Sequence, residues 1–145
     1  MKGKLEFTIP GTMPNLNDII KAKATVTSRK GKRIRSKYTD MKVAETAKVM
    51  ALAATGSREG ARKGRAFVVM HHFEPNRRRD FDNVHAGARK FVLDGLVKAH
   101  VLPNDGWKDV SGTILAFCEH DPDNPRIEVQ VFWGNFTVYV EDMDP

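Results

Sequence analysis

The segment from Arg65 to Phe73 constrains the fold of this chain most strongly, because both of its alternating faces are largely apolar. One face would carry Phe67, Val69, His71 and Phe73, and the other would carry Val68, Met70 and His72. A strand that is apolar on both faces is usually buried on both sides of its sheet. We therefore predict that this strand is central.

Apolar periodicity and turn residues predict the rest of the fold. The predicted strands span about 5–10, 65–73, 110–119 and 126–133, and the predicted helices span about 39–55 and 83–99. The Asp-Pro-Asp-Asn-Pro turn at 121–125 predicts a hairpin between the last two strands, and 136–140 would add a short final strand. The order β-α-β-α-β-β indicates an α/β (α+β) fold, a small mixed sheet with two main helices.

Each predicted helix has an expected start and an expected inner face. Thr39 or Asp40 would cap the first helix, and Gly56 would end it. The residues that share one face of this helix are Val43, Ala47, Met50 and Ala54. The second helix would bury Val84, Ala88, Phe91 or Val92, Gly95 and Ala99. His100 then stands where glycine is usual, and histidine is among the residues that tolerate a positive φ.

Length and composition limit the class of protein. The 145 residues fit a single domain spanning 1–145. No apolar run approaches the roughly 18 residues that a membrane span requires, and the start of the chain lacks the apolar segment of a secretory signal. With one cysteine, Cys118, the chain cannot build a disulfide framework or a cysteine-based zinc finger. We expect a cytoplasmic protein with no membrane partner.

The positive charge is concentrated in one segment. Lys21–Lys37 holds eight Lys and Arg residues and no acid, while the rest of the chain holds 16 basic and 18 acidic residues. Few large apolar residues interrupt this segment, so we predict a mobile basic loop that binds phosphates, with a solvated loop lacking any partner as the alternative. The candidate DNA-binding residues in it are Arg29, Lys30, Lys32, Arg33 and Arg35. The acidic end of the chain, about 141–145, is expected to fray.

Two aspartates at the start of the second predicted helix are the most informative pair. Asp80 and Asp82 would converge on one hard cation, since Mg²⁺ takes one or two protein carboxylates and completes its shell with water and substrate phosphate. Arg77, Arg78 and Arg79 precede them, and this density of opposite charge suits a phosphodiester lying between metal and guanidinium. The alternative is an aspartate that caps the helix, with solvated arginines before it.

Two further charged residues extend this candidate site. Asp105 follows the second helix, so only the sheet could bring it near the helix start. Lys90 is two turns beyond Asp82, at a net rotation of about 80°, and could hold the scissile phosphate. The alternative, and the commoner role of a helix lysine, is an exposed Lys90 that pairs with Asp94, four residues later.

Other candidates are weaker. His71 and His72 face opposite ways in a strand and cannot share a metal, so each is expected to be a core or surface histidine. The alternative is that His72 or His85 approaches the substrate. Trp107 could stack on a base, although packing is the more frequent role of a tryptophan. Cys118 lies in an apolar strand and is interpreted as a small core residue.

Three linked blocks resemble the RusA family of Holliday junction resolvases. They are Arg78–Asn83 (RRDFDN), Lys90–Leu96 (KFVLDGL) and Val101–Asp105 (VLPND). The first strand followed by Pro14–Asn17 (PNLN) is similar to the family's opening element, so the resemblance covers about Leu5 to Trp133. The helix is about one turn longer here than in the family, and Ala86 occupies the nearer lysine position.

The resemblance implies a RusA-like fold and a homodimeric, Mg²⁺-dependent endonuclease, with Mn²⁺ as an alternative ion. Members of the family nick four-way DNA junctions symmetrically in recombination and repair, and small resolvases of this kind suit a prophage. The essential residues of the family, three aspartates and a lysine, correspond here to Asp80, Asp82, Asp105 and Lys90. Two alternatives remain: a DNA-binding or architectural module without catalysis, and a nuclease that acts on other branched DNA.

Overall fold

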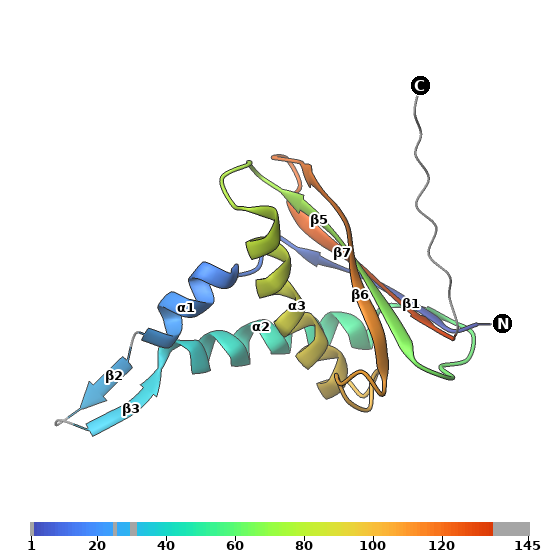
Figure 1. Ribbon diagram of the computed structural model, residues 1–145, viewed down its shortest axis with the longest axis horizontal. Coiled ribbons are helices and arrows are strands. Elements are labelled where there is room, and N and C mark those ends of the chain that lie inside the picture. Colours follow the sequence, from blue (N-terminus) through green and yellow to red (C-terminus); the bar gives the residue numbers. More distant parts are fainter. Residues whose placement is uncertain (1, 25, 30–31, 135–145) are drawn as a thin grey trace.

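The computed structural model describes residues 2–24, 26–29 and 32–134, with side chains described outside 25–35 and 114–117. The elements are β1 (Lys4–Pro10), α1 (Leu16–Ala24), β2 (Val26–Arg29), β3 (Lys32–Ser36), α2 (Lys37–Ala54), β4 (Ser57–Glu59), β5 (Ala66–Glu74), α3 (Phe81–Lys98), β6 (Val110–His120) and β7 (Arg126–Trp133). The predicted mixed α/β class is confirmed. A five-stranded sheet has the order β4-β1-β7-β5-β6, and β2 and β3 form a separate antiparallel pair (Figure 1).

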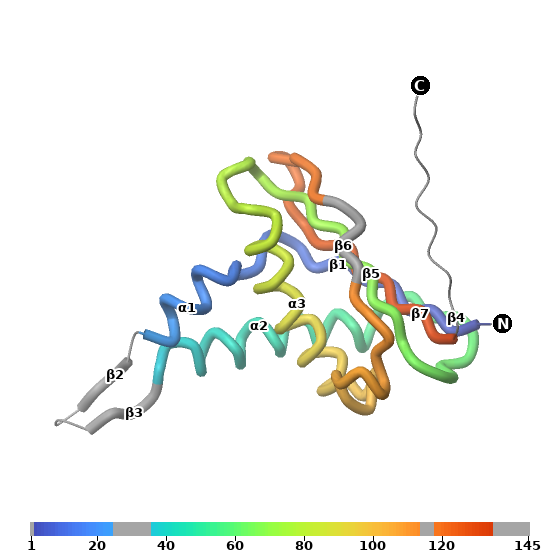
Figure 2. The backbone as a smooth tube through the Cα atoms, viewed as in Figure 1, coloured from blue at the N-terminus to red at the C-terminus, as the bar shows by residue number. Residues whose placement is uncertain are grey.

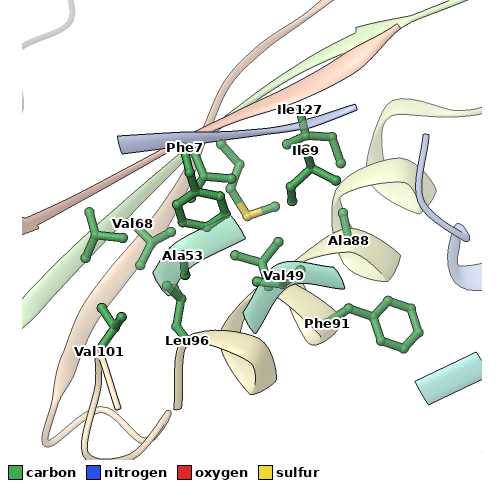
Figure 3. Close-up of a cluster of buried hydrophobic side chains, with 14 of the residues drawn as sticks. Phe7, Ile9, Val49, Ala53, Val68, Ala88, Phe91, Leu96, Val101 and Ile127 are labelled. Atoms are coloured by element: carbon green, nitrogen blue, oxygen red, sulfur yellow. The ribbon is translucent and has the colours of Figure 1, made fainter. Parts of the chain in front are cut away.

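The predicted central position of β5 is confirmed, since β7 and β6 flank it. It pairs antiparallel with β7 and parallel with β6, and α3 is the crossover that joins β5 to β6. Val68 and Met70 are buried on the face that α2 and α3 cover, while Phe67 and Val69 on the other face are only half-buried. Side chains of β1, β5 and β7 meet those of both helices in one core (Figure 3).

The predicted hairpin between the last two strands is wrong. β7 lies between β1 and β5, whereas β6 lies at the edge of the sheet. The turn carries the chain across the end of β5, where the Asp121 amide donates a 2.8 Å hydrogen bond to the Glu74 carbonyl. A central place suits β7, because Ile127, Val129 and Val131 alternate inward as predicted and are buried against β1 and β5. The candidate strand at 136–140 lies outside the described residues.

The basic segment is not the loop that its composition suggested. Its start belongs to α1, and the following residues form the β2–β3 pair. The signal for α1 was present in the sequence, because Asn15 and Asp18 form a reciprocal capping box. The Asp18 amide donates to Asn15 Oδ1 and the Asn15 amide donates to Asp18 Oδ2, both at 2.9 Å. Ile19 and Ala22 anchor the helix on the core.

The two long helices differ in how well their faces were predicted. In α3 the predicted stripe is confirmed, and His100 has a φ of 59° at the helix end, as expected. In α2 the prediction is wrong: the helix begins two residues earlier, after Ser36, and Val43 is 62% exposed. The buried residues of α2 are Thr46, Val49 and Ala53. A Cβ on Gly95 of α3 would lie 2.5 Å from Val49, so close helix contact selects this face.

Candidate active site

The loop from β5 to α3 is fixed by Arg79. Its guanidinium donates two hydrogen bonds to the buried Glu74 carboxylate, from Nε at 2.7 Å and from Nη2 at 3.2 Å. Nη1 donates to the Met13 carbonyl at 2.6 Å. This forked pairing ties the end of β5 to the chain before α1. Arg79 therefore positions the loop, and its guanidinium is already engaged where we had predicted a phosphate contact.

The two preceding arginines are exposed. The Arg78 amide donates to Asn76 Oδ1 at 3.0 Å, which shapes the turn, while the side chains of Arg77 and Arg78 extend into solvent. They remain accessible to an anion, and so the predicted role in phosphate binding fits these two residues better than Arg79.

Asp80 and Asp82 lie together at the start of α3, as the spacing predicted. Asp80 occupies the N-cap position with extended backbone (φ −67°, ψ 140°), yet its carboxylate makes no capping hydrogen bond. Asp82 lies in the first turn, and both side chains are exposed. The positive end of the helix dipole favours two carboxylates here. The capping alternative thus does not account for the Asp80 side chain, and both carboxylates are available to a hard cation.

A pocket of about 600 Å³ lies beside these residues, at the carboxyl ends of the parallel strands β5 and β6. It is lined by Glu74, Asn76, Arg77, Arg79, Phe81, Val84, Cys118, Glu119 and His120. Ligand sites of α/β sheets are common at this edge. Sequence reasoning missed Glu74, Phe81 and His120 as lining residues. The signal was their position, at the last residues of two strands and the first residue of the connecting helix.

Asp105 lies far from the other two aspartates in the same chain. It follows α3, whose 18 residues extend about 27 Å, and the loops before and after the helix lie at its opposite ends (Figure 2). Asp105 lines a smaller depression of about 170 Å³ with Asp94 and Lys98. Among the described residues, no group of three or more His, Cys, Asp or Glu side chains could hold a metal ion. One chain therefore brings Asp80 and Asp82 together without Asp105.

Lys90 faces the start of α2. Its Nζ lies 5.5 Å from the centre of the Tyr38 ring, and Lys23 Nζ lies 4.8 Å from the same ring. Asp94 lies 3.9 Å from Lys42, so its nearest basic partner is on α2 and not the expected Lys90. Lys90 is exposed and about 12 Å along the helix axis from Asp82. From this position Lys90 could contact a phosphate only if the substrate extends along α3 from Asp82. Its role in phosphate binding stays a prediction.

Two histidines flank the loop between β5 and α3: His72 near the end of β5 and His85 near the start of α3. His72 is fully buried, and both of its ring nitrogens lack a hydrogen-bond partner. The His85 ring meets it edge-on at 5.8 Å between centroids. Burial lowers the pKa of His72 to about 4, helped by His85, Arg79 and His71, and burial also lowers the pKa of His85. His72 is thus a core histidine, which is one of the two roles predicted for it. Cys118 is half-buried in β6, and burial raises the pKa of its thiol.

No protein-family model matches this chain, and no curated protein matches it. The RusA resemblance therefore remains a prediction from the motif residues. In the described part of the chain, every helix is too short or too polar to cross a membrane.

Proposed function

We propose that this protein is a Mg²⁺-dependent, structure-selective DNA endonuclease that acts as a homodimer and resolves Holliday junctions. The observation that carries the proposal is the pair of exposed carboxylates, Asp80 and Asp82, at one helix start beside Arg77 and Arg78. The carboxylate of Asp80 is not used for capping, so its oxygens are free to coordinate. The order of the three sequence blocks supports the choice of reaction.

The donor set fits a hard divalent ion. Asp80 and Asp82 offer only oxygen, which Mg²⁺ prefers, and Mn²⁺ accepts the same ligands. When bound, the ion would supply positive charge at the scissile phosphate and lower the pKa of an attacking water. The carboxylates would hold and orient that charge. Arg77 and Arg78 would bind the flanking phosphates, so that the DNA backbone lies across the start of α3.

The third aspartate would come from a second copy of the chain. The length of α3 keeps Asp105 at the far end of its own helix. A homodimer in which the two α3 helices run antiparallel would place the Asp105 of one copy near the Asp80 and Asp82 of the other. Two equivalent sites related by a two-fold axis suit paired nicking of a junction. Lys90 lies between the two ends of α3. In such a dimer it would contact a phosphate bound near its own Asp80 and Asp82 or near its own Asp105.

The basic residues of β2 and β3 would bind the arms of the junction. Arg29, Lys32, Arg33 and Arg35 belong to this pair of strands, and Lys30 lies outside the described residues. Contacts of this kind read backbone phosphates and carry no base sequence. They would add affinity that falls steeply with salt.

The test is a nicking assay on a synthetic four-way junction, a fork and a linear duplex, each with and without Mg²⁺. We expect nicking of the junction only with Mg²⁺. Asp82→Asn should abolish nicking while junction binding is kept or strengthened, because the substitution removes only negative charge. Glu59→Gln, an equally exposed carboxylate on β4, is the control and should nick normally.

Three outcomes would contradict the proposal in different ways. Equal loss of binding and nicking in Asp82→Asn would show that the residue supports the fold or the DNA contact. Salt-sensitive binding that ignores Mg²⁺, with no strand scission, would indicate the DNA-binding module instead. Preferential nicking of the fork would indicate a nuclease for other branched DNA.

A further inference from the structure

The edge strand β6 is long for the edge of a sheet. It has 11 residues, and in the described part of the chain no strand pairs with its outer side. The opposite edge of the sheet is β4, which has only three residues. Natural proteins usually shorten, bulge or cover such edges, because the unpaired N–H and C=O groups can pair with another chain. β6 is therefore a candidate for pairing with another strand.

Two irregularities in β6 restrict where pairing can occur. The register between β5 and β6 shifts between Ala66 and Phe67, and again between Met70 and His72. The regular stretch between these shifts is Gly112–Leu115. An antiparallel partner would align with this stretch. If the partner is a second copy, a two-fold axis perpendicular to the sheet must pass midway between the two copies of one residue, which then pair with each other. Thr113 is one of the two middle residues of this stretch, and its self-pairing would set Trp107 opposite Glu119, which lines the pocket of about 600 Å³.

The two ends of β6 carry complementary features. Trp107, just before β6, is 85% exposed, more than any other large apolar side chain that the structure describes. At the other end of β6, the pocket of about 600 Å³ is lined by Phe81, Val84 and Cys118 among mainly charged and polar side chains. An antiparallel copy of β6 would bring the Trp107 of each chain to the pocket of the other. Because the tryptophan and the pocket lie on the same chain, the surface is self-complementary, as a two-fold interface requires.

The same arrangement would make the α3 helices of the two copies run in opposite directions. In one chain α3 runs from the carboxyl ends of β5 and β6 back to the start of β6 (Figure 1). A two-fold axis through Thr113 would set the two α3 helices antiparallel on one face of a joined sheet. The loop that carries Asp105 would then lie beside the partner copy's Asp80 and Asp82. This last step rests on the proposed function, whereas the edge pairing does not.

We propose that two copies of this chain associate through antiparallel pairing of their β6 strands, with Thr113 at the two-fold axis and Trp107 seated in the pocket of the other copy. The occupant of the edge is thus a second copy, since one chain supplies the exposed tryptophan at one end of β6 and the pocket that receives it at the other end. The interface joins two five-stranded sheets into one sheet of about ten strands.

Engineered disulfides test the register. Cys118→Ser removes the native thiol, and Thr113→Cys is then added. Directly opposed residues of antiparallel strands have Cα atoms about 4.5–5.5 Å apart, within the range of about 4.4–6.8 Å for a disulfide. We expect a covalent dimer under mild oxidation. Ser57→Cys in the same Cys118→Ser background, on the opposite edge strand β4, is the matched control and should stay uncrosslinked.

Sedimentation of the full chain tests the contact of Trp107. Trp107→Ala should raise the dimer dissociation constant at least about tenfold, since a buried interface tryptophan is a typical hot spot. Val43→Ala, an exposed apolar side chain on α2, should leave the dissociation constant unchanged. A monomer at micromolar concentration, or crosslinking through Ser57→Cys and not Thr113→Cys, would overturn the inference. So would a dimer indifferent to Trp107→Ala. Normal crosslinking without any nicking would instead refute only the proposed function.

Discussion

Mixing two variants that are each expected to be inactive is the sharpest test of whether two copies share the aspartates of one site. In Asp82→Asn the site lacks one carboxylate of the α3 pair, and in Asp105→Asn it lacks the carboxylate that follows α3. Because α3 extends about 27 Å, the structure separates these residues within one chain. Each homodimer is expected to be inactive. A heterodimer of the two variants, however, has one site in which both substitutions meet and one site that is intact.

The expected activity follows from counting. Random pairing of equal amounts gives about one half heterodimers, and each heterodimer has one intact site of two, so nicking should recover to about one quarter of the wild-type rate. The recovered activity should be single-strand nicking without paired resolution, since only one site per dimer works. Co-expression with two different tags, followed by tandem purification, would raise the recovery to about one half.

The control is a mixture of Asp82→Asn with Asp80→Asn. Both substitutions fall in the same half of the site, so neither site of that heterodimer is intact and no nicking should return. The shared-site reasoning is refuted if Asp82→Asn mixed with Asp105→Asn stays inactive while tandem purification shows that heterodimers form. It is also refuted if the control mixture recovers equally.

Two further predictions concern stability. Arg79→Ala should lower the free energy of unfolding by about 3 kcal/mol in urea titrations, because it leaves the buried Glu74 carboxylate unpaired. Arg78→Ala should leave the free energy of unfolding unchanged. It should instead reduce the slope of log K for DNA binding against log salt concentration by about 1, since one phosphate contact is lost. The buried His72 has a pKa lowered to about 4, so the fold favours neutral imidazole, and its contribution is complete above the unfolded pKa of about 6.5. That contribution is lost as the pH falls from about 6.5 to 4, by about 3 kcal/mol in all. His72→Phe should reduce the loss of unfolding free energy over this pH range, as measured in urea titrations, and an unchanged pH profile would refute the assignment.

Local patterns in the sequence predicted the buried face of an element correctly where large apolar residues recur on a single side of it. The stripe of α3 and the inward residues of β7 are confirmed, since large apolar side chains leave one way to bury each element. The predicted face of α2 was wrong because apolar residues are spread around this helix, so their spacing does not select one face. Close contact with Gly95 of α3 favours the face that carries Thr46 and Val49. The position of β7 between β1 and β5 depends on pairing between distant segments, which no local window contains.

The candidate site also has one part that local spacing predicts and one part that depends on how distant segments pack. Asp80 and Asp82 are adjacent because they are two residues apart at a helix start, so spacing alone was sufficient. The relation of Asp105 to this pair is set by the length of α3 and the direction of β6, which return the chain to the opposite end of the sheet. A longer helix moves Asp105 further from its own Asp82. If two α3 helices run antiparallel in a dimer, a longer α3 would also move Asp105 along the α3 of the other copy. A change in the length of α3 and a change in the position of the two-fold axis would then have to occur together. In the proposed dimer, the length of α3 would thus constrain the position of the two-fold axis as well as the fold of one chain.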